Sequence, residues 1–206
     1  MRVPAAEQRL LLELQSHDTR IARLTHEARS LPVRARLTAG EAAREEQDTE
    51  RIRLEATYSD QRRELARLEA DIEKVVNRRQ RHEERLGAGG VPAKEVVAIQ
   101  AEIDHLRQRQ SILEDEQLEA MEEADATEGA RAFVASRIAE LDEQLARDGE
   151  EKQAELARLR AAAAAVQAQR DTVALQLPSG LVELYDAVRR ETGGLGVVGL
   201  SGTTTE

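Results

Sequence analysis

The sequence predicts an all-α protein, a long antiparallel coiled-coil helical hairpin kinked near Pro32 and Gly149, with a short C-terminal helix and an irregular tail. Three observations support this fold: sustained heptads, a near absence of aromatic residues, and a single Gly-rich reversal. The 206 residues include no Trp, one Phe and two Tyr, whereas 34% are charged. Aromatic side chains supply much of the burial in a compact core. The expected core is therefore a thin aliphatic seam, as in coiled coils.

The reversal lies at residues 87–92, where Gly87-Ala88-Gly89-Gly90-Val91-Pro92 interrupts the helical pattern. Glycine suits the positive-φ positions that end a helix, and proline suits the first turn of the next one. The arms on either side, Pro4–Leu86 and Ala93–Leu177, are nearly equal in length. They can therefore pair with each other from tip to base. A parallel homodimer is the alternative to this hairpin.

The first arm is predicted to contain two helices, Pro4–Ser30 and Val33–Arg85. Pro32 separates them because it lacks a backbone donor and disfavours helical angles in the residue before it. The apolar pattern also shifts its frame at this point, as expected if the proline resets the register. The polar stretch Gly40–Thr49 is weakly patterned, and we expect it to be loosely ordered.

The second arm is predicted to form one helix, Ala93–Leu177, with an unbroken heptad frame. Such a frame indicates a left-handed coil with knobs-into-holes packing. Its core positions are Val96, Ile99, Ile103, Leu106, Leu113, Val134, Ile138, Leu141, Leu145, Leu159, Val166 and Val173. Folding the chain about Gly90 places Pro32 opposite Asp148, beside Gly149. The two irregularities meet, which predicts the kink.

The C-terminal part, residues 178–206, is expected to be separate from the hairpin, residues 1–177. Pro178 ends the long helix, and Ser179 is a suitable N-cap for a short amphipathic helix, Gly180–Glu191. The tail contains a G-x-G-x-x-G pattern at residues 194–199. A dinucleotide site needs a strand before this pattern and a helix after it. Since both are lacking, we expect a turn followed by one short strand at 197–200.

The sequence shows no pattern of catalytic or metal-binding residues. Its four His are not spaced to form a helical pair, and it has no Cys. We therefore expect no enzymatic activity, no catalytic or cofactor-binding residue, and no metal or other cofactor in this chain. The N-terminus lacks a signal-peptide core, and no apolar run is long enough to span a membrane. A cytoplasmic location is the expectation.

Charge is distributed unevenly, although the net charge is -10. Six basic and two acidic residues lie between Lys74 and Lys94, whereas thirteen acidic residues and three arginines lie between Leu113 and Glu150. We take the cations nearest the reversal as the candidate partner-binding or nucleic-acid-binding residues: Arg78, Arg79, Arg81, Arg85 and Lys94. A solvated face with local ion pairs is the simpler interpretation. No aromatic residue lies among these cations, so any nucleic-acid contact would be to phosphate.

Several segments resemble the bacterial C4-type zinc-ribbon coiled-coil family. The similar segments are Leu11–Gln15 with Asp18, Leu31-Pro32, Arg85-Leu86, Lys94–Val96, Ile112–Glu122, Leu177-Pro178 and Leu184-Tyr185. The resemblance implies a helical hairpin followed by a zinc ribbon with two Cys pairs, in nucleic-acid-binding or regulatory proteins. The sequence ends at Glu206, about where the first Cys pair is expected. It is therefore either truncated or a member without the ribbon, and zinc is expected only with the ribbon.

Two hypotheses for function follow. The first is a non-enzymatic interaction or scaffold module that presents its basic tip and acidic flank to a protein partner, as a monomer or a homodimer. The second is a regulator that binds RNA or DNA, with the basic tip as the contact. The acidic net charge favours the first hypothesis.

Overall fold

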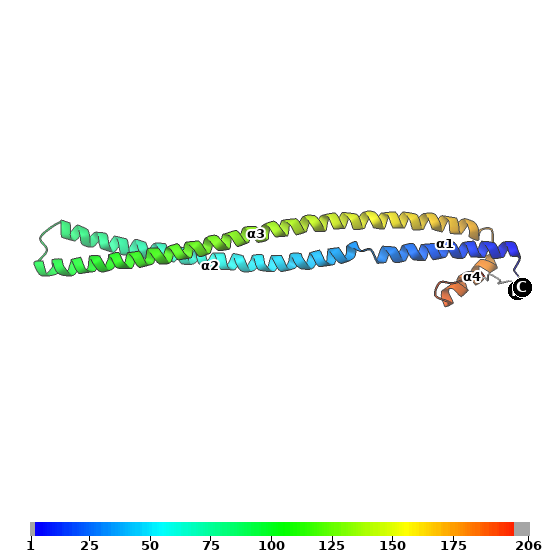
Figure 1. The fold of residues 1–206 in the computed structure, drawn as a ribbon, viewed down its shortest axis with the longest axis horizontal. Coiled ribbons are helices and arrows are strands. Elements are labelled where there is room, and N and C mark those ends of the chain that lie inside the picture. The colour runs from blue at the N-terminus through cyan, green and yellow to red at the C-terminus, as the bar shows by residue number, and fades with distance from the viewer. Residues whose placement is uncertain (1–2, 200–206) are drawn as a thin grey trace, which may run out of the picture. The chain divides into compact units, whose positions relative to one another are not determined.

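The computed structural model describes residues 3–199 and confirms the predicted fold class (Figure 1). Its helices are α1 (Ala5–Arg29), α2 (Val33–Gly87), α3 (Ala93–Ala174) and α4 (Ser179–Glu191). The first arm, α1 followed by α2, runs antiparallel to α3. The bounds of α1, α2 and α3 lie within a few residues of the predicted ones, because proline and glycine set most of them.

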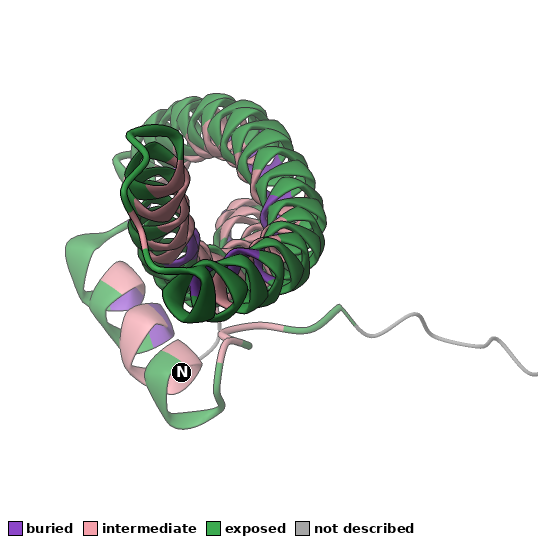
Figure 2. Ribbon diagram, turned by 90° about the vertical axis from the view of Figure 1, so that its left-hand side faces the viewer, coloured by how far each residue is buried: buried purple, intermediate pink, exposed green. Residues whose placement is uncertain are grey.

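The structure divides into two compact units. The terminal unit contains the chain up to Gly40 and from Gln144 onward, and the tip unit contains Glu41–Glu143. In each unit, one segment of the first arm packs against one segment of α3. Buried residues lie on the faces where the paired helices meet, and exposed residues cover the outer faces (Figure 2).

The tip unit has the thin seam that the heptads predict. Its buried apolar residues are Leu65, Leu68, Ile99, Ile103, Leu106, Leu113, Ala124, Val134 and Leu141. The reversal between α2 and α3 is a short loop in which Gly89 and Gly90 both adopt φ values near +77°. Side chains with a Cβ rarely adopt this conformation. The Gly-rich sequence is therefore required by the backbone of the turn.

The predicted interruption at Pro32 is confirmed. Helix α1 ends at Arg29, and α2 begins at Val33. Leu31 and Val33 are buried together with Leu159 of α3, so the interruption is packed rather than loose. Just beyond it, the Arg36 guanidinium donates to a carboxylate oxygen of Asp148 at 3.0 and 3.1 Å.

The folding-back argument places Pro32 opposite Asp148, but the register is shifted from this prediction. Leu31 and Val33, on either side of Pro32, pack with Leu159, whereas Asp148 pairs with Arg36, about one turn further along the first arm. Helix α3 itself continues through Gly149 without a break. The expectation of a loose zone at Gly40–Thr49 is wrong, since α2 is helical throughout. A Cβ on Gly40 would lie 2.9 Å from a methyl carbon of Leu145, so the missing side chain provides room for close packing.

Helix α4 packs on the terminal unit. Its Leu181 and Tyr185 join Leu11 and Leu14 of α1, and Val173 and Leu177 beside the end of α3, in one buried cluster. Ser179 is the first helical residue rather than the N-cap. Pro178 occupies the cap position, and no side chain caps the helix.

The expectation of a strand in the tail is wrong for its described part. No residue up to Gly199 is in a strand. The backbone N–H groups of Gly196 and Val197 donate to a side-chain oxygen of Gln15 instead of to a second strand. Leu200 and the rest of the predicted tail lie outside the described residues.

Candidate functional site

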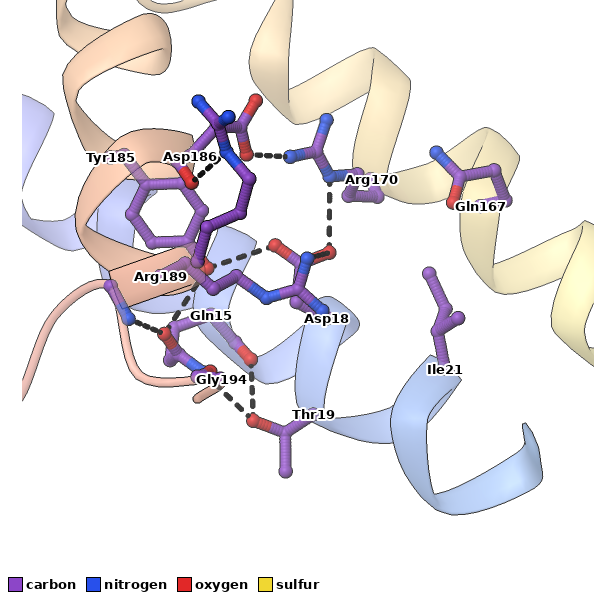
Figure 3. A network of polar contacts seen from close by, with 12 residues as sticks. Gln15, Asp18, Thr19, Ile21, Gln167, Arg170, Tyr185, Asp186, Arg189 and Gly194 are labelled. Carbon is purple, nitrogen blue, oxygen red and sulfur yellow. Dashed lines mark hydrogen bonds and ion pairs between the residues drawn. The ribbon is translucent and has the colours of Figure 1, made fainter. Parts of the chain in front are cut away.

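The terminal unit contains a buried polar network that joins three helices (Figure 3). Gln15 and Asp18 come from α1, Arg170 from α3, and Tyr185 and Arg189 from α4. The spacing of three residues places Gln15 and Asp18 on the same face of α1 as the buried Leu11 and Leu14. The network is therefore built into the core of this unit.

Asp18 is the centre of the network, with only 3% of its surface exposed. Its Oδ1 lies 3.2 Å from Nε of Arg170 and 3.4 Å from Nη1 of Arg189. Its Oδ2 accepts a hydrogen bond of 2.9 Å from the Tyr185 hydroxyl. Arg170 also reaches Asp186 with its Nη2 at 2.6 Å. Two carboxylates therefore balance two guanidinium groups, as a buried charge requires.

Gln15 connects this network to the segment after α4. Its side-chain Nε2 donates to the Gly194 carbonyl at 2.9 Å, and its Oε1 accepts from the Gly196 N–H at 2.6 Å. Gly196 lies against the ring of Tyr185, and a Cβ at this position would come within 2.2 Å of it. The glycines of the G-x-G pattern therefore allow a turn to approach an aromatic ring, and they form no nucleotide-binding loop.

The environment raises the pKa of two groups of this network, Tyr185 and Arg170. Burial, followed by the hydrogen bond to Asp18, raises the pKa of the Tyr185 hydroxyl. Burial lowers the pKa of Arg170 while Asp18 and Asp186 raise it, and the net shift is upward. The arrangement of hydrogen bonds and ion pairs positions α4 against α1 and α3.

Three of the five cations predicted as the site lie near carboxylates, and two do not. Arg78 lies 2.8 Å from Glu102, and Arg85 lies 2.7 Å from Glu95, both across the hairpin. Arg79 is a longer 3.8 Å from Glu83. The remaining two, Arg81 and Lys94, are exposed and have no carboxylate partner among the described residues.

Helix α3, which follows the reversal, also changes the charge balance of the tip. It brings Glu95, Glu102 and Asp104 alongside the basic segment, and adds Arg107. From Arg78 to Arg107 there are six basic and five acidic residues. The linear pattern of the first arm therefore overstates the positive charge that a partner would meet.

The outer face of α3 in the tip unit is acidic and also carries exposed apolar side chains. Leu118 is 57% exposed and Phe133 is 72% exposed. The neighbouring carboxylates without a salt bridge in the described part of the chain are Asp115, Glu119, Glu122, Glu123 and Asp125. We call residues 112–133 of this face the acidic face. The sequence showed its charge, and the heptad frame leaves Leu118 and Phe133 outside the predicted core positions.

Comparison with known proteins shows to which family the hairpin belongs. A family model described as the CT398-like coiled coil hairpin domain matches residues 14–193. The chain belongs to this family. The similar proteins include the uncharacterized proteins MT2288 and Rv2229c from two strains of Mycobacterium tuberculosis. Each is 30% identical over 202 residues, which is 98% of this chain and 82% of the relative.

A solved structure of a protein from Mycobacterium smegmatis has the same fold as this CT398-like hairpin. It is 30% identical in sequence, with a TM-score of 0.78, and the match covers 93% of this chain and 80% of that one. The predicted membership of the C4-type zinc-ribbon family is wrong, because the matching family is a coiled coil hairpin domain and the sequence contains no Cys. Most of the segments that suggested the ribbon family lie within residues 14–193, which the coiled coil hairpin model matches.

The described residues contain no group of three or more His, Cys, Asp or Glu that could hold a metal ion. None of their helices is long and apolar enough to cross a membrane. Sequence reasoning missed the polar network, although a signal for it was present. Gln15 and Asp18 are polar residues on the buried side of α1, and such residues need partners from other helices.

Proposed function

We propose that this CT398-like hairpin is a non-enzymatic interaction module that binds a basic amphipathic segment of a protein partner on its acidic face. The observation that carries this proposal is the combination of unpaired carboxylates with exposed Leu118 and Phe133 on one helix face. Recognition of this kind requires no metal or cofactor. The rigid helical pairing behind the face would present it in one fixed conformation.

The two kinds of side chain on the acidic face have different roles in this proposal. Burying a large apolar side chain contributes about 1.5–3 kcal/mol, so contacts to Leu118 and Phe133 would supply affinity. The carboxylates Asp115, Glu119 and Glu122 recur at spacings of four and three, so they form a stripe along the helix. Such a stripe attracts a basic partner and fixes its register.

The alternative, binding of nucleic acid at the tip, has less support. Arg78 and Arg85 are paired with Glu102 and Glu95, and a phosphate would have to compete with these carboxylates. The acidic face would also repel a nucleic acid that extended along the hairpin. These features favour a protein partner over a polyanion.

The test uses a defined probe, a fluorescein-labelled amphipathic peptide of about 18 residues that has Leu on one helical face and Lys elsewhere. We expect it to bind the full chain, and Leu118→Ser with Phe133→Ser to weaken it at least about 10-fold, as measured by fluorescence anisotropy. Both side chains are exposed, so the helical content and melting of the variant should stay unchanged.

A matched control is the pair Ile52→Ser and Val97→Ser, which are 58% and 72% exposed in the same unit. This control should bind the probe as the wild type does. Equal loss in both variants would show only non-specific attraction of a cation to an acidic protein. Unchanged binding in the Leu118→Ser, Phe133→Ser variant would contradict the proposal.

A further inference from the structure

A groove along α1 in the terminal unit carries a charge opposite to that of the acidic face. It consists of two hollows that share Leu24. One, of about 300 Å³, has a floor of Leu24, Ala28, Leu156, Leu159 and Ala163. The other, of about 560 Å³, extends along α1 from Ser16 to Glu27.

The sequence explains why the groove is open. The first arm leaves its helical path between Arg29 and Val33, and Leu31 and Val33 turn inward to pack with Leu159. The residues of α3 that line the first hollow include Ala163 from the run Ala161–Ala165, and its small side chain does not fill the space. The alanines therefore leave an apolar hollow at the interruption, whereas Leu159 just before them is fully buried.

Five arginines line the groove: Arg20, Arg23, Arg29, Arg34 and Arg160. Within residues 3–199, none of the five forms a salt bridge with a carboxylate. The one acid in the lining, Glu27, lies 3.5 Å from Arg158 instead. Most arginines of the coiled coil elsewhere are ion-paired, so this accumulation of unpaired guanidinium groups is a local feature.

We propose that this groove, the arginine groove, binds an acidic amphipathic helix of a partner protein. The apolar floor fits a stripe of aliphatic side chains, and the surrounding guanidinium groups fit carboxylates on either side of that stripe. The hollows follow the helix from Ser16 to Arg29, about 20 Å, which is the length of a docked helix of four turns.

Nucleic acid is the other anionic macromolecule that arginines bind, and the groove suits it less well. The floor made by Leu24, Ala28 and Ala163 is apolar, so these side chains could not hydrogen-bond to sugar or phosphate. No aromatic side chain lines either hollow, so bases could not stack. The proposal is independent of the acidic face, which lies in the other unit and has the opposite charge.

The probe for the groove is a fluorescein-labelled peptide of about 18 residues with Leu on one helical face and Glu elsewhere. We expect the full chain to bind it, with affinity falling as salt rises. The variant Arg20→Gln, Arg23→Gln, Arg29→Gln, Arg160→Gln should bind at least about 10-fold more weakly. All four side chains are exposed, so its circular dichroism and melting should match those of the wild type.

Two further measurements make the result specific. The control variant Arg53→Gln, Arg62→Gln, Arg63→Gln, Arg137→Gln removes the same charge from exposed positions of the tip unit and should bind the probe as the wild type does. A scrambled peptide of the same composition should bind poorly, because it has no apolar face. Absence of binding at about 100 μM probe, equal loss in both variants, or tighter binding of a single-stranded DNA oligonucleotide than of the peptide would each overturn the proposal.

Discussion

The terminal unit and the tip unit use the same pairing of helices but hold it together differently. In the tip unit, the core is a seam of aliphatic residues, and charges such as Arg44 and Asp142 meet at the exposed edge. In the terminal unit, Asp18 and Gln15 are buried in the core and bind residues of α3, α4 and the following turn. The difference indicates that the seam supplies general stability, whereas the polar network specifies where α4 docks.

The largest expected effect is the loss of Asp18. Asp18→Ala would leave Arg170 and Arg189 without their shared carboxylate, and breaking a buried pair costs about 3–5 kcal/mol. We expect α4 to undock, with faster hydrogen exchange and proteolysis at residues 179–191. The matched variant in the tip unit is Asp142→Ala, which breaks an exposed pair and should not change stability measurably. Equal effects would remove the distinction between the two units.

Two glycines give the next comparison. Gly196→Ala would place a Cβ against the Tyr185 ring, and we expect it to destabilise the docked turn by about 1–3 kcal/mol. Gly129→Ala is in an open part of α3 and should stabilise the helix by about 0.5–1 kcal/mol. Thermal melting measures both. A neutral Gly196→Ala would show that the turn does not pack on Tyr185 in solution.

The fold was largely predictable from the sequence, and the network was not. Heptad spacing, Pro32 and residues 87–92 determine helices and reversals through local geometry, which one sequence displays directly. The partners of Asp18 depend on which residue of α3 faces it, and Arg170 is separated from it by 152 positions. The acidic face could be located by charge. Its Phe133 lies outside the predicted core positions, but a heptad frame does not show whether such a residue is exposed or covered by another segment.

The two tyrosines allow a comparison by pH. Tyr185→Phe removes hydrogen bonds to Gln15 and Asp18 and should cost about 1–2 kcal/mol at neutral pH. Because the pKa of folded Tyr185 is raised, its contribution is complete below the ordinary tyrosine pKa of about 10 and is lost as pH rises above that value. The stability difference between wild type and Tyr185→Phe should therefore shrink in alkaline melts.

Tyr58→Phe serves as the control for the alkaline experiment. This substitution keeps the aromatic ring, whose centroid lies 4.4 Å from the Cζ atom of Arg131. It also makes Tyr185 the single tyrosine of the chain. The tyrosinate absorbance of this variant should then appear only at a pH above the ordinary tyrosine pKa of about 10. Titration near pH 10 would show that the Tyr185 hydroxyl is not buried and hydrogen-bonded to Asp18 in solution.

The smallest expected effect is at the tip. Replacing Arg78, Arg79, Arg81, Arg85 and Lys94 with Gln should leave helicity and melting nearly unchanged, because these are surface residues. The same variant tests the nucleic-acid hypothesis with a DNA oligonucleotide. Each lost phosphate contact would lower the salt slope of binding by about 0.7–0.9. An unchanged salt slope would show that these five residues do not contact phosphate and that the tip is only a solvated turn.

The position of Asp18 near the start of the chain has a consequence for synthesis. This carboxylate emerges from the ribosome long before Arg170 and Tyr185 have been made, so it stays hydrated until the whole hairpin exists. Its burial then depends on α1, α3 and α4 arriving together. A hairpin closed in a shifted register would not bring Arg170 to Asp18, and α4 would have no binding site. We therefore expect α4 to dock only when the two arms are aligned in the register that brings Arg170 to Asp18.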